Sequence, residues 1–418
     1  MAGLPAVLVL GPPRYVGPLG MMRSLGRIGV KVYGLRHRSA ASSSRFCAGT
    51  VDVGRGGRPW GDDARTVAEL TEAGAKIGEG AILVPGSDEW SVVVARNAAE
   101  LARTYRFPTI PVELIQDLAA KDGLYRLALS HGLPTPRIAF PLTRDQALAA
   151  VSSLEYPVML KPIQSRPDVL DKAVVDNEDD LMRAYLRMEE SPDRPNVMFQ
   201  EYIPGGDQDV WIFNGYFDQD SRCLAAFTGV KVRQHPARMG IASLGELRQN
   251  STVIDMTTHF MQAVGYRGIV DIGYRFDRRD GQYKVLDINP RLGGAFRMFV
   301  GDDGLDVARA MYFDLTGKAV PPVRATDGRR WINEQADLVA SNHYRKLEGL
   351  SLGGWLRSLR GVREGATWAP DDPIPFAFAM WSLAAETLSG KWRRFRHGAR
   401  SSLSRSATRR SRAGETAA

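Results

Sequence analysis

GIVDIGYRF (268–276) and LDINPRLGG (286–294) are the two stretches that decide the fold, because each places polar side chains in an apolar strand. Asp271 lies among apolar neighbours in the first stretch, where an unpaired carboxylate is costly to bury. Asp287 and Asn289 lie two positions apart in the second and therefore project from one face of a strand. If the two strands pair as a hairpin, Asp271 comes close to Asp287, and carboxylate and amide oxygens suit Mg²⁺. The pattern predicts a divalent-cation site at the end of a β-hairpin.

A guanidinium is expected beside this site, because Arg291 follows Asn289 on the same alternation and can bind a phosphate group. Two simpler interpretations stay open. Asp271 can form a salt bridge with Arg275 or Lys284, and the strand end can be an ordinary Asn-Pro turn with an exposed arginine.

The segment before the hairpin is also rich in strands. The segments 197–203, 209–217 and 223–232 are predicted as further strands, and one helix is predicted at about 252–264. A strand-rich block with one inserted helix favours an antiparallel sheet of the α+β class.

The first 115 residues have a different pattern, in which short apolar strands alternate with helices. The strands AVLVL (6–10), VKVYGL (30–35) and AILVPG (81–86) predict a mostly parallel α/β domain. The loop after the first strand, GPPRYVGPLG (11–20), is not a GxGxxG sequence, which argues against a dinucleotide oxidoreductase.

Four motifs in order resemble the ATP-grasp superfamily. A lysine begins a helix in AAKDGLYRLALSHGLPTP (119–136), a second lysine lies in the strand YPVMLKP (156–162), FQEYIPGGDQD (199–209) follows, and an Asp strand closed by DINPR comes last. Relatives in this superfamily include D-alanine–D-alanine ligase, biotin carboxylase and the large subunit of carbamoyl-phosphate synthase. The chain looks most similar to bacterial carboxylate–amine ligases of the superfamily.

The resemblance implies a fold and a division of the chain. It implies a Rossmann-like pre-ATP-grasp α/β domain (1–115) and a two-lobed ATP-grasp domain with an antiparallel sheet (116–320). A C-terminal extension of unclear structure (321–390) and a basic tail (391–418) would follow.

The resemblance also implies roles for single residues, taken position by position. Lys121 and Lys161 match the lysines that hold ATP phosphates, and Glu201, Tyr202 and Ile203 match the hinge that borders the adenine. Asp209, or Asp207 if the register slips, matches the ribose carboxylate. Asp271, Asp287 and Asn289 match the Mg²⁺ ligands, and Arg291 matches the arginine that faces the transferred phosphate.

Two departures from the superfamily pattern are visible. The segment after the strand lysine, IQSRPDVLDKAVV (163–175), has no glycine, so Ser165, Arg166 and Lys172 would replace backbone contacts to the phosphates. Asp287 stands where the superfamily usually has Glu. Its shorter side chain still reaches a metal ion but is less suited to bridging two ions.

The acceptor side is expected in GVKVRQHPARMGIASLGE (229–246). Lys231, Arg233 and His235 would share one strand face before a flexible loop, and cations on one face suit a carboxylate substrate. We assign Lys231 and Arg233 to the catalytic set with Arg291. A solvated basic face is the alternative, and His235 is left as structural.

The net charge of +8 belongs to one end of the chain. Residues 391–418 contain nine lysines and arginines and one glutamate, so residues 1–390 are neutral overall. This distribution argues against a nucleic-acid-binding body. The apolar run 376–388 and the basic tail suggest weak contact with an anionic membrane surface, or else a core helix with a solubilising tail. Two cysteines without metal spacing fit a cytoplasmic protein, with a peripheral position at the inner membrane face as the alternative.

Together these features predict an ATP-dependent carboxylate–amine ligase that forms an amide through an acyl phosphate. The cofactors would be ATP and Mg²⁺, or Mn²⁺ in its place, and the partners a small carboxylate and a small amine, with a homodimer also considered. The alternative is an ATP-grasp protein with another phosphoryl-transfer or regulatory role, located at a membrane periphery.

Overall fold

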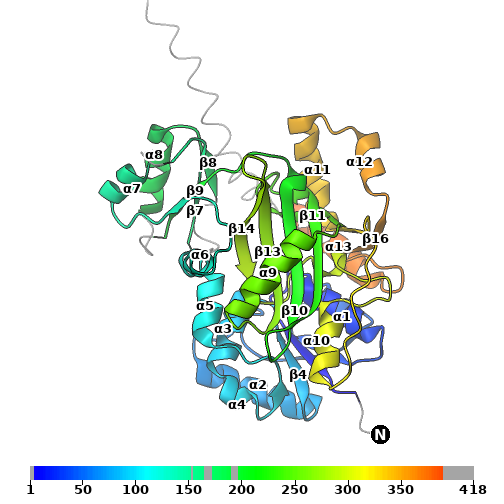
Figure 1. Cartoon of the computed structure of the whole chain (residues 1–418). Helices are drawn as coiled ribbons and strands as arrows, with labels where there is room; N and C mark the ends of the chain where they lie inside the picture. The colour runs from blue at the N-terminus through cyan, green and yellow to red at the C-terminus, as the bar shows by residue number, and fades with distance from the viewer. Residues whose placement is uncertain (1–3, 152–153, 164–171, 190–195, 389–418) are drawn as a thin grey trace, which may run out of the picture.

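The computed structural model describes residues 4–151, 154–163, 172–189 and 196–388, which form three β-sheets with helices around them (Figure 1). The predicted mixture of α/β and α+β architecture is confirmed, because one sheet is parallel and the other two are largely antiparallel. Within the described residues, no helix combines the length and the apolar character that crossing a membrane requires.

The N-terminal sheet is parallel and has the strand order β3-β2-β1-β4-β5. Asp62 and Ser87 begin two of its helices by accepting backbone hydrogen bonds. The elements are β1 (Val7–Leu10), α1 (Gly17–Gly26), β2 (Val32–Leu35), η1 (Ala41–Ser43), β3 (Cys47–Val51), α2 (Asp63–Ile77), β4 (Ala81–Pro85), α3 (Asp88–Arg96), α4 (Ala98–Leu101) and β5 (Tyr105–Arg106).

A small four-stranded sheet with the order β6-β9-β7-β8 follows, with α7 and α8 packed on it. The segment 197–203 is a strand as predicted, but it pairs with β6 and β7 in this sheet and not with the strands that follow it in the sequence. The elements are α5 (Val112–Ala119), α6 (Lys121–Ser130), β6 (Ile138–Ala139), α7 (Arg144–Val151), β7 (Val158–Lys161), β8 (Ala173–Val175), α8 (Glu178–Glu189) and β9 (Met198–Glu201).

The largest sheet has seven strands in the order β14-β13-β10-β11-β12-β15-β16, and only its last pair is parallel. The predicted helix near 252–264 is α9. The elements are η2 (Asp207–Asp209), β10 (Val210–Phe217), β11 (Cys223–His235), β12 (Ile241–Leu247), α9 (Ser251–Ala263), β13 (Gly268–Asp277), β14 (Gln282–Asn289), η3 (Phe296–Met298), α10 (Val307–Leu315), β15 (Arg330–Ile332) and β16 (Val362–Gly365).

The predicted hairpin is present as β13 and β14. Asp271 pairs with Asn289, and Gly273 pairs with Asp287. Since side chains alternate along a strand, Asp271, Asp287 and Asn289 all lie on one face of the hairpin. The other face carries Ile272 and Ile288 into the core under α9.

Two parts of the large sheet differ from the sequence-based expectations. The segment expected to be a flexible loop after His235 contains the strand β12. The C-terminal extension, whose structure was unclear, adds β15 to β12 and then β16 to β15. It also supplies α11 (Glu334–Glu348), α12 (Leu352–Ser358) and α13 (Ile374–Leu388). The division of the chain into domains stays a prediction, and the basic tail lies outside the described residues.

The N-terminal sheet joins the large sheet through α1, η3 and α10, whose apolar side chains form one buried cluster. Helix α1 approaches η3 closely at Gly20, because a Cβ there would lie 2.6 Å from the ring of Phe296. Met21 and Leu25 of the same helix are fully buried in this cluster.

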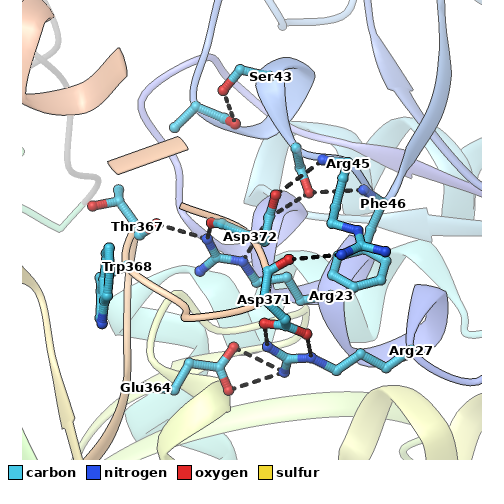
Figure 2. A network of polar contacts seen from close by, with 12 residues as sticks. Arg23, Arg27, Ser43, Arg45, Phe46, Glu364, Thr367, Trp368, Asp371 and Asp372 are labelled. Atoms are coloured by element: carbon cyan, nitrogen blue, oxygen red, sulfur yellow. Dashed lines mark hydrogen bonds and ion pairs between the residues drawn. The ribbon is translucent and has the colours of Figure 1, made fainter. Parts of the chain in front are cut away.

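A buried ion pair ties α1 to the C-terminal extension (Figure 2). Arg23 and Asp372 are each about 1% exposed, and Arg23 Nε donates to Asp372 Oδ2 over 2.9 Å. The same carboxylate accepts from the Ser44 hydroxyl (2.7 Å) and from the backbone NH of Arg45 (3.0 Å). Asp372 therefore holds three separate segments together.

Replacing Asp372 by Ala is expected to destabilise the chain by about 3–5 kcal/mol, because Arg23 would remain buried without a counter-charge. Asp371→Ala is the matched control, since its partner Arg27 is partly exposed and also donates to Glu364. We expect at most about 1 kcal/mol for the control. Equal shifts of the two urea-unfolding midpoints would contradict this.

Candidate active site

Polar and charged side chains from α6, the small sheet and the large sheet converge where β14 ends. The acidic face of the β13–β14 hairpin lies opposite lysines from the start of α6, the end of β7 and the middle of β11. The members are Lys121, Lys161, Lys231, Asp271, Asp287, Asn289 and Arg291. Sequence reasoning predicted each of them, and the structure brings them together.

The three oxygen-bearing side chains of the hairpin form the acidic part of the site. Among the described residues, the hydrogen bond to the Asp271 carboxylate is a long contact of 3.4 Å from Asn214 Nδ2 on β10 to Oδ1. Burial raises the pKa of Asp271 to about 6, an effect that Arg291 opposes and the charge of Asp287 reinforces. Asn289 Nδ2 lies 3.3 Å from Asp287 Oδ2.

The simpler interpretation of Asp271 is excluded by its neighbours. Arg275 donates to the carbonyl oxygen of Gly205 over 2.8 Å, and Lys284 forms an ion pair with Asp277 over 2.7 Å. Neither side chain neutralises Asp271.

The lysines outnumber the carboxylates that can pair with them. Lys121 forms an ion pair with Asp287. Lys161 is 5% exposed, and its ammonium group donates to a neutral acceptor, Gln200 Oε1, over 2.8 Å. Lys231 likewise donates to the carbonyl oxygen of Gly240 over 2.7 Å.

The pKa shifts agree with this excess of positive charge. Burial, followed by the charges of Lys172 and Lys121, holds the pKa of Lys161 well below its usual range. Burial and Lys172 lower the pKa of Lys231 to about 8. Burial alone would raise the pKa of Asp287, but the nearby cations, led by Lys121, hold this pKa well below its usual range.

Arg291 connects the hairpin end to the N-terminal sheet. Its Nε donates to Asp88 Oδ1 at the start of α3 over 2.6 Å, and its Nη2 donates to Asn289 Oδ1 over 3.1 Å. Its Nη1 donates to the hydroxyl of Tyr15, whose ring also lies 5.2 Å from the guanidinium carbon. The guanidinium is therefore held in a defined orientation beside the acidic face.

The acids expected at the nucleotide hinge all have protein partners. Glu201 accepts from Arg279 (2.5 Å) and from the backbone NH of Arg137 (2.9 Å). Asp209 pairs with Arg278 over 2.8 Å, and Asp207 accepts from Gln234 over 2.6 Å. A second group, the Tyr344 hydroxyl, also donates to Asp207. Tyr202 and Ile203 follow β9 and connect these acids, with Ile203 buried.

Arg233 is held away from this cluster. It makes a bidentate pair with Asp337 of α11, with both distances 2.9 Å, and its Nη1 donates to Ser358. The expected common face with Lys231 fails because the β11–β12 pairing shifts register on both sides of Arg233. His235, expected to be structural, is partly buried at the end of the same strand.

Four contributors to the site were missed by sequence reasoning. Gln200 and Asn214 are polar residues inside apolar strands, which is the same signal that identified Asp271. Tyr15 and Asp88 had no such signal, because they lie in the N-terminal part and reach Arg291 only through the tertiary fold.

The phosphate-covering segment is described only at its ends. Lys172 precedes β8, is exposed, and its charge lowers the pKa of Lys161 and Lys231, so its ammonium group acts on the cluster. Ser165 and Arg166 lie outside the described residues.

The side chains present fit a magnesium ion. Within the part of the chain that the structure describes, Asp271 is a carboxylate with one weak hydrogen bond, and Asp287 is a second carboxylate whose side chain is 47% exposed. Asn289 now turns its amide nitrogen toward Asp287, so the amide must rotate to present its oxygen to a cation. Among the described residues no group of three His, Cys, Asp or Glu side chains could hold a metal, so the protein donors would be two carboxylates and one amide, completed by water or phosphate oxygens.

Comparison with solved structures identifies the fold. An L-amino acid ligase from Bacillus licheniformis superposes with a TM-score of 0.56 at 15% identity, covering 77% of this chain and 78% of that one. The biotin carboxylase domain of 2-oxoglutarate carboxylase from Hydrogenobacter thermophilus, solved with MgADP and bicarbonate, gives 0.58 at 16% identity and covers 76% and 71%.

The chain has the ATP-grasp fold. The resemblance drawn from the four motifs is thereby confirmed. No protein-family model matches the sequence. A curated ATP-grasp relative, D-aspartate ligase from Enterococcus faecium, is 24% identical over 242 residues. That alignment covers 54% of this chain and 57% of the relative, so the chain spans just over half of the relative's length.

Proposed function

We propose that this chain is an ADP-forming ligase that joins a small carboxylate to a small amine through an acyl phosphate, using Mg-ATP. The proposal rests on one observation above all. Within the described residues, only Lys121 of the three lysines has an ion-pair partner, and Lys161 is buried against a neutral side chain. A site with this excess of desolvated positive charge suits the phosphates of a nucleotide.

The nucleotide would lie between the small sheet and the large sheet. Lys121 and Lys161 would contact its phosphates, and the backbone of Tyr202 and Ile203 would border its base. Because Asp207 and Asp209 already have partners, a ribose hydroxyl would have to share one of these carboxylates.

Asp271, Asp287 and Asn289 would hold Mg²⁺. When bound, this ion neutralises phosphate charge and favours transfer of the terminal phosphoryl group. Lys121 forms an ion pair with Asp287, and nucleotide phosphates would compete with this carboxylate for Lys121 and so free the carboxylate for the cation.

Arg291 and Lys231 would act on the acyl substrate. A carboxylate oxygen of the substrate attacks the terminal phosphorus, the bond to ADP breaks, and an acyl phosphate forms. The amine then attacks the acyl carbon, phosphate leaves, and the amine loses a proton. Arg291, fixed by Asp88 and Tyr15, would stabilise the negative charge that develops on oxygen. We exclude Arg233 from this set because its guanidinium is paired with Asp337.

Amino acids are the first substrate class to test, since the relatives are a D-aspartate ligase and an L-amino acid ligase. The partners we propose are small molecules only, and a homodimer and a cytoplasmic location stay predictions.

The test is a screen of carboxylate and amine pairs for release of ADP and phosphate from Mg-ATP. Hydroxylamine should replace the amine and yield a hydroxamate of the accepted carboxylate, because it traps an acyl phosphate. ATP binding without turnover stimulated by any carboxylate would contradict the ligase proposal and favour a regulatory ATP-binding protein.

A further inference from the structure

A polar cavity lies apart from the candidate active site, and none of its lining residues belongs to the lysine–carboxylate cluster. Its volume is about 440 Å³, which is within the range of pockets for small molecules. Its walls come from Arg27 just after α1, from η3 through the start of α10, from Arg329 just before β15, from β16, and from residues 370–371. The cavity thus lies where the N-terminal part, the large sheet and the C-terminal extension meet.

Arginines dominate the lining of this cavity. Five guanidinium groups face three carboxylates, those of Asp302, Glu364 and Asp371. The arginines are Arg27, Arg297, Arg309, Arg329 and Arg363.

Glu364 is the shared counter-charge of the arginine cavity. It accepts from Arg297 over 2.7 Å and from Arg27 over 3.2 Å, and Arg329 lies 3.6 Å away (Figure 2 shows the contacts to Arg27). Glu364 thus contacts three guanidinium groups, of which Arg27 also pairs with Asp371 and Arg297 also pairs with Asp306, whereas Arg329 has no other carboxylate partner among the described residues.

Within the described part of the chain, Arg329 and Arg363 keep donors for which no protein acceptor is found. Arg329 Nε is buried and has no hydrogen-bond partner among the described residues. Burial, then the nearby Arg297, lowers the pKa of Arg329 to about 10. Arg363 is exposed at the rim of the arginine cavity. Arg309 donates to a neutral acceptor, the carbonyl oxygen of Ser24, over 3.2 Å.

We propose that the arginine cavity is a binding site for a phosphate-bearing small molecule. Guanidinium groups match phosphate oxygens in charge and in their paired donors, and Arg329 and Arg363, which both line the cavity, would supply such contacts. The volume admits a ligand larger than inorganic phosphate. This site is independent of the proposed ligase function, and its ligand would brace α1 against β16 across the junction.

Calorimetric titration of the full-length chain with pyrophosphate tests the proposal, without added Mg²⁺ and at constant ionic strength. We expect saturable binding that weakens about tenfold in Arg363→Gln and in Arg329→Gln. Arg363 is exposed, so its variant should fold normally even if Arg329→Gln does not. Arg360→Gln is the matched control, because this arginine is exposed three residues earlier and does not line the cavity.

A further variant, Lys161→Met, separates the two anion sites. Pyrophosphate binding that persists in Lys161→Met and weakens in Arg363→Gln supports the arginine cavity. Binding that disappears in Lys161→Met and is unchanged in Arg363→Gln assigns the anion to the candidate active site and overturns the proposal. The absence of any saturable binding to the wild-type chain also overturns it.

Discussion

Lys161→Met is expected to weaken ATP binding about a hundredfold without lowering the stability of the fold. The ammonium group is buried beside other cations and has only a neutral acceptor, so it is costly in the ligand-free protein. The substitution would remove the charge-assisted hydrogen bond that the Lys161 ammonium group is proposed to donate to a phosphate of ATP. The apolar arm of Met fills the same space, and Gln200 Oε1 keeps the hydroxyl of Tyr125 as a donor at 3.1 Å.

The measurement is a calorimetric titration with ATP, alongside thermal unfolding of both chains. Lys318→Met is the control, because this lysine is exposed after α10 and lies outside the cluster. A variant that binds ATP normally would remove Lys161 from the nucleotide site. A large drop in the unfolding temperature would show that its role is structural.

Asp287→Asn is expected to reduce ADP formation by about two orders of magnitude or more and to raise the Mg²⁺ concentration needed for half-maximal rate. The substitution removes one of the two carboxylates of the acidic face and also the ion-pair partner of Lys121. Asp287→Glu should retain part of the activity, because the facing Gly273 leaves room beside this side chain.

The rate of ADP release against Mg²⁺ concentration checks this prediction. Asp280→Asn is the control on the same hairpin, since it disrupts only a partly exposed ion pair with Lys284 in the turn. An unchanged Mg²⁺ dependence in Asp287→Asn would exclude this carboxylate from the metal site. An equal loss in Asp280→Asn would indicate a general effect on the hairpin.

Much of the fold was predictable because local residue patterns indicate its strands. Alternating apolar residues identified β10, β11, β13 and β14, and the polar residues among them identified the acidic face. The short strands β15 and β16 were missed, because three or four residues carry too little periodicity to be recognised without their neighbours.

The sequence by itself determined the chemistry of the hairpin: which carboxylates lie in an apolar strand, and that Asp271, Asp287 and Asn289 share one face. This follows because the side-chain alternation of a strand is a local property. Only the tertiary structure decided which cations meet that face. Because the register shifts in β11, Lys231 lies in the cluster whereas Arg233 pairs with Asp337. Contacts between distant segments place Tyr15 and Asp88 beside Arg291. Such choices depend on pairing and packing between segments far apart in the chain, which no local pattern encodes.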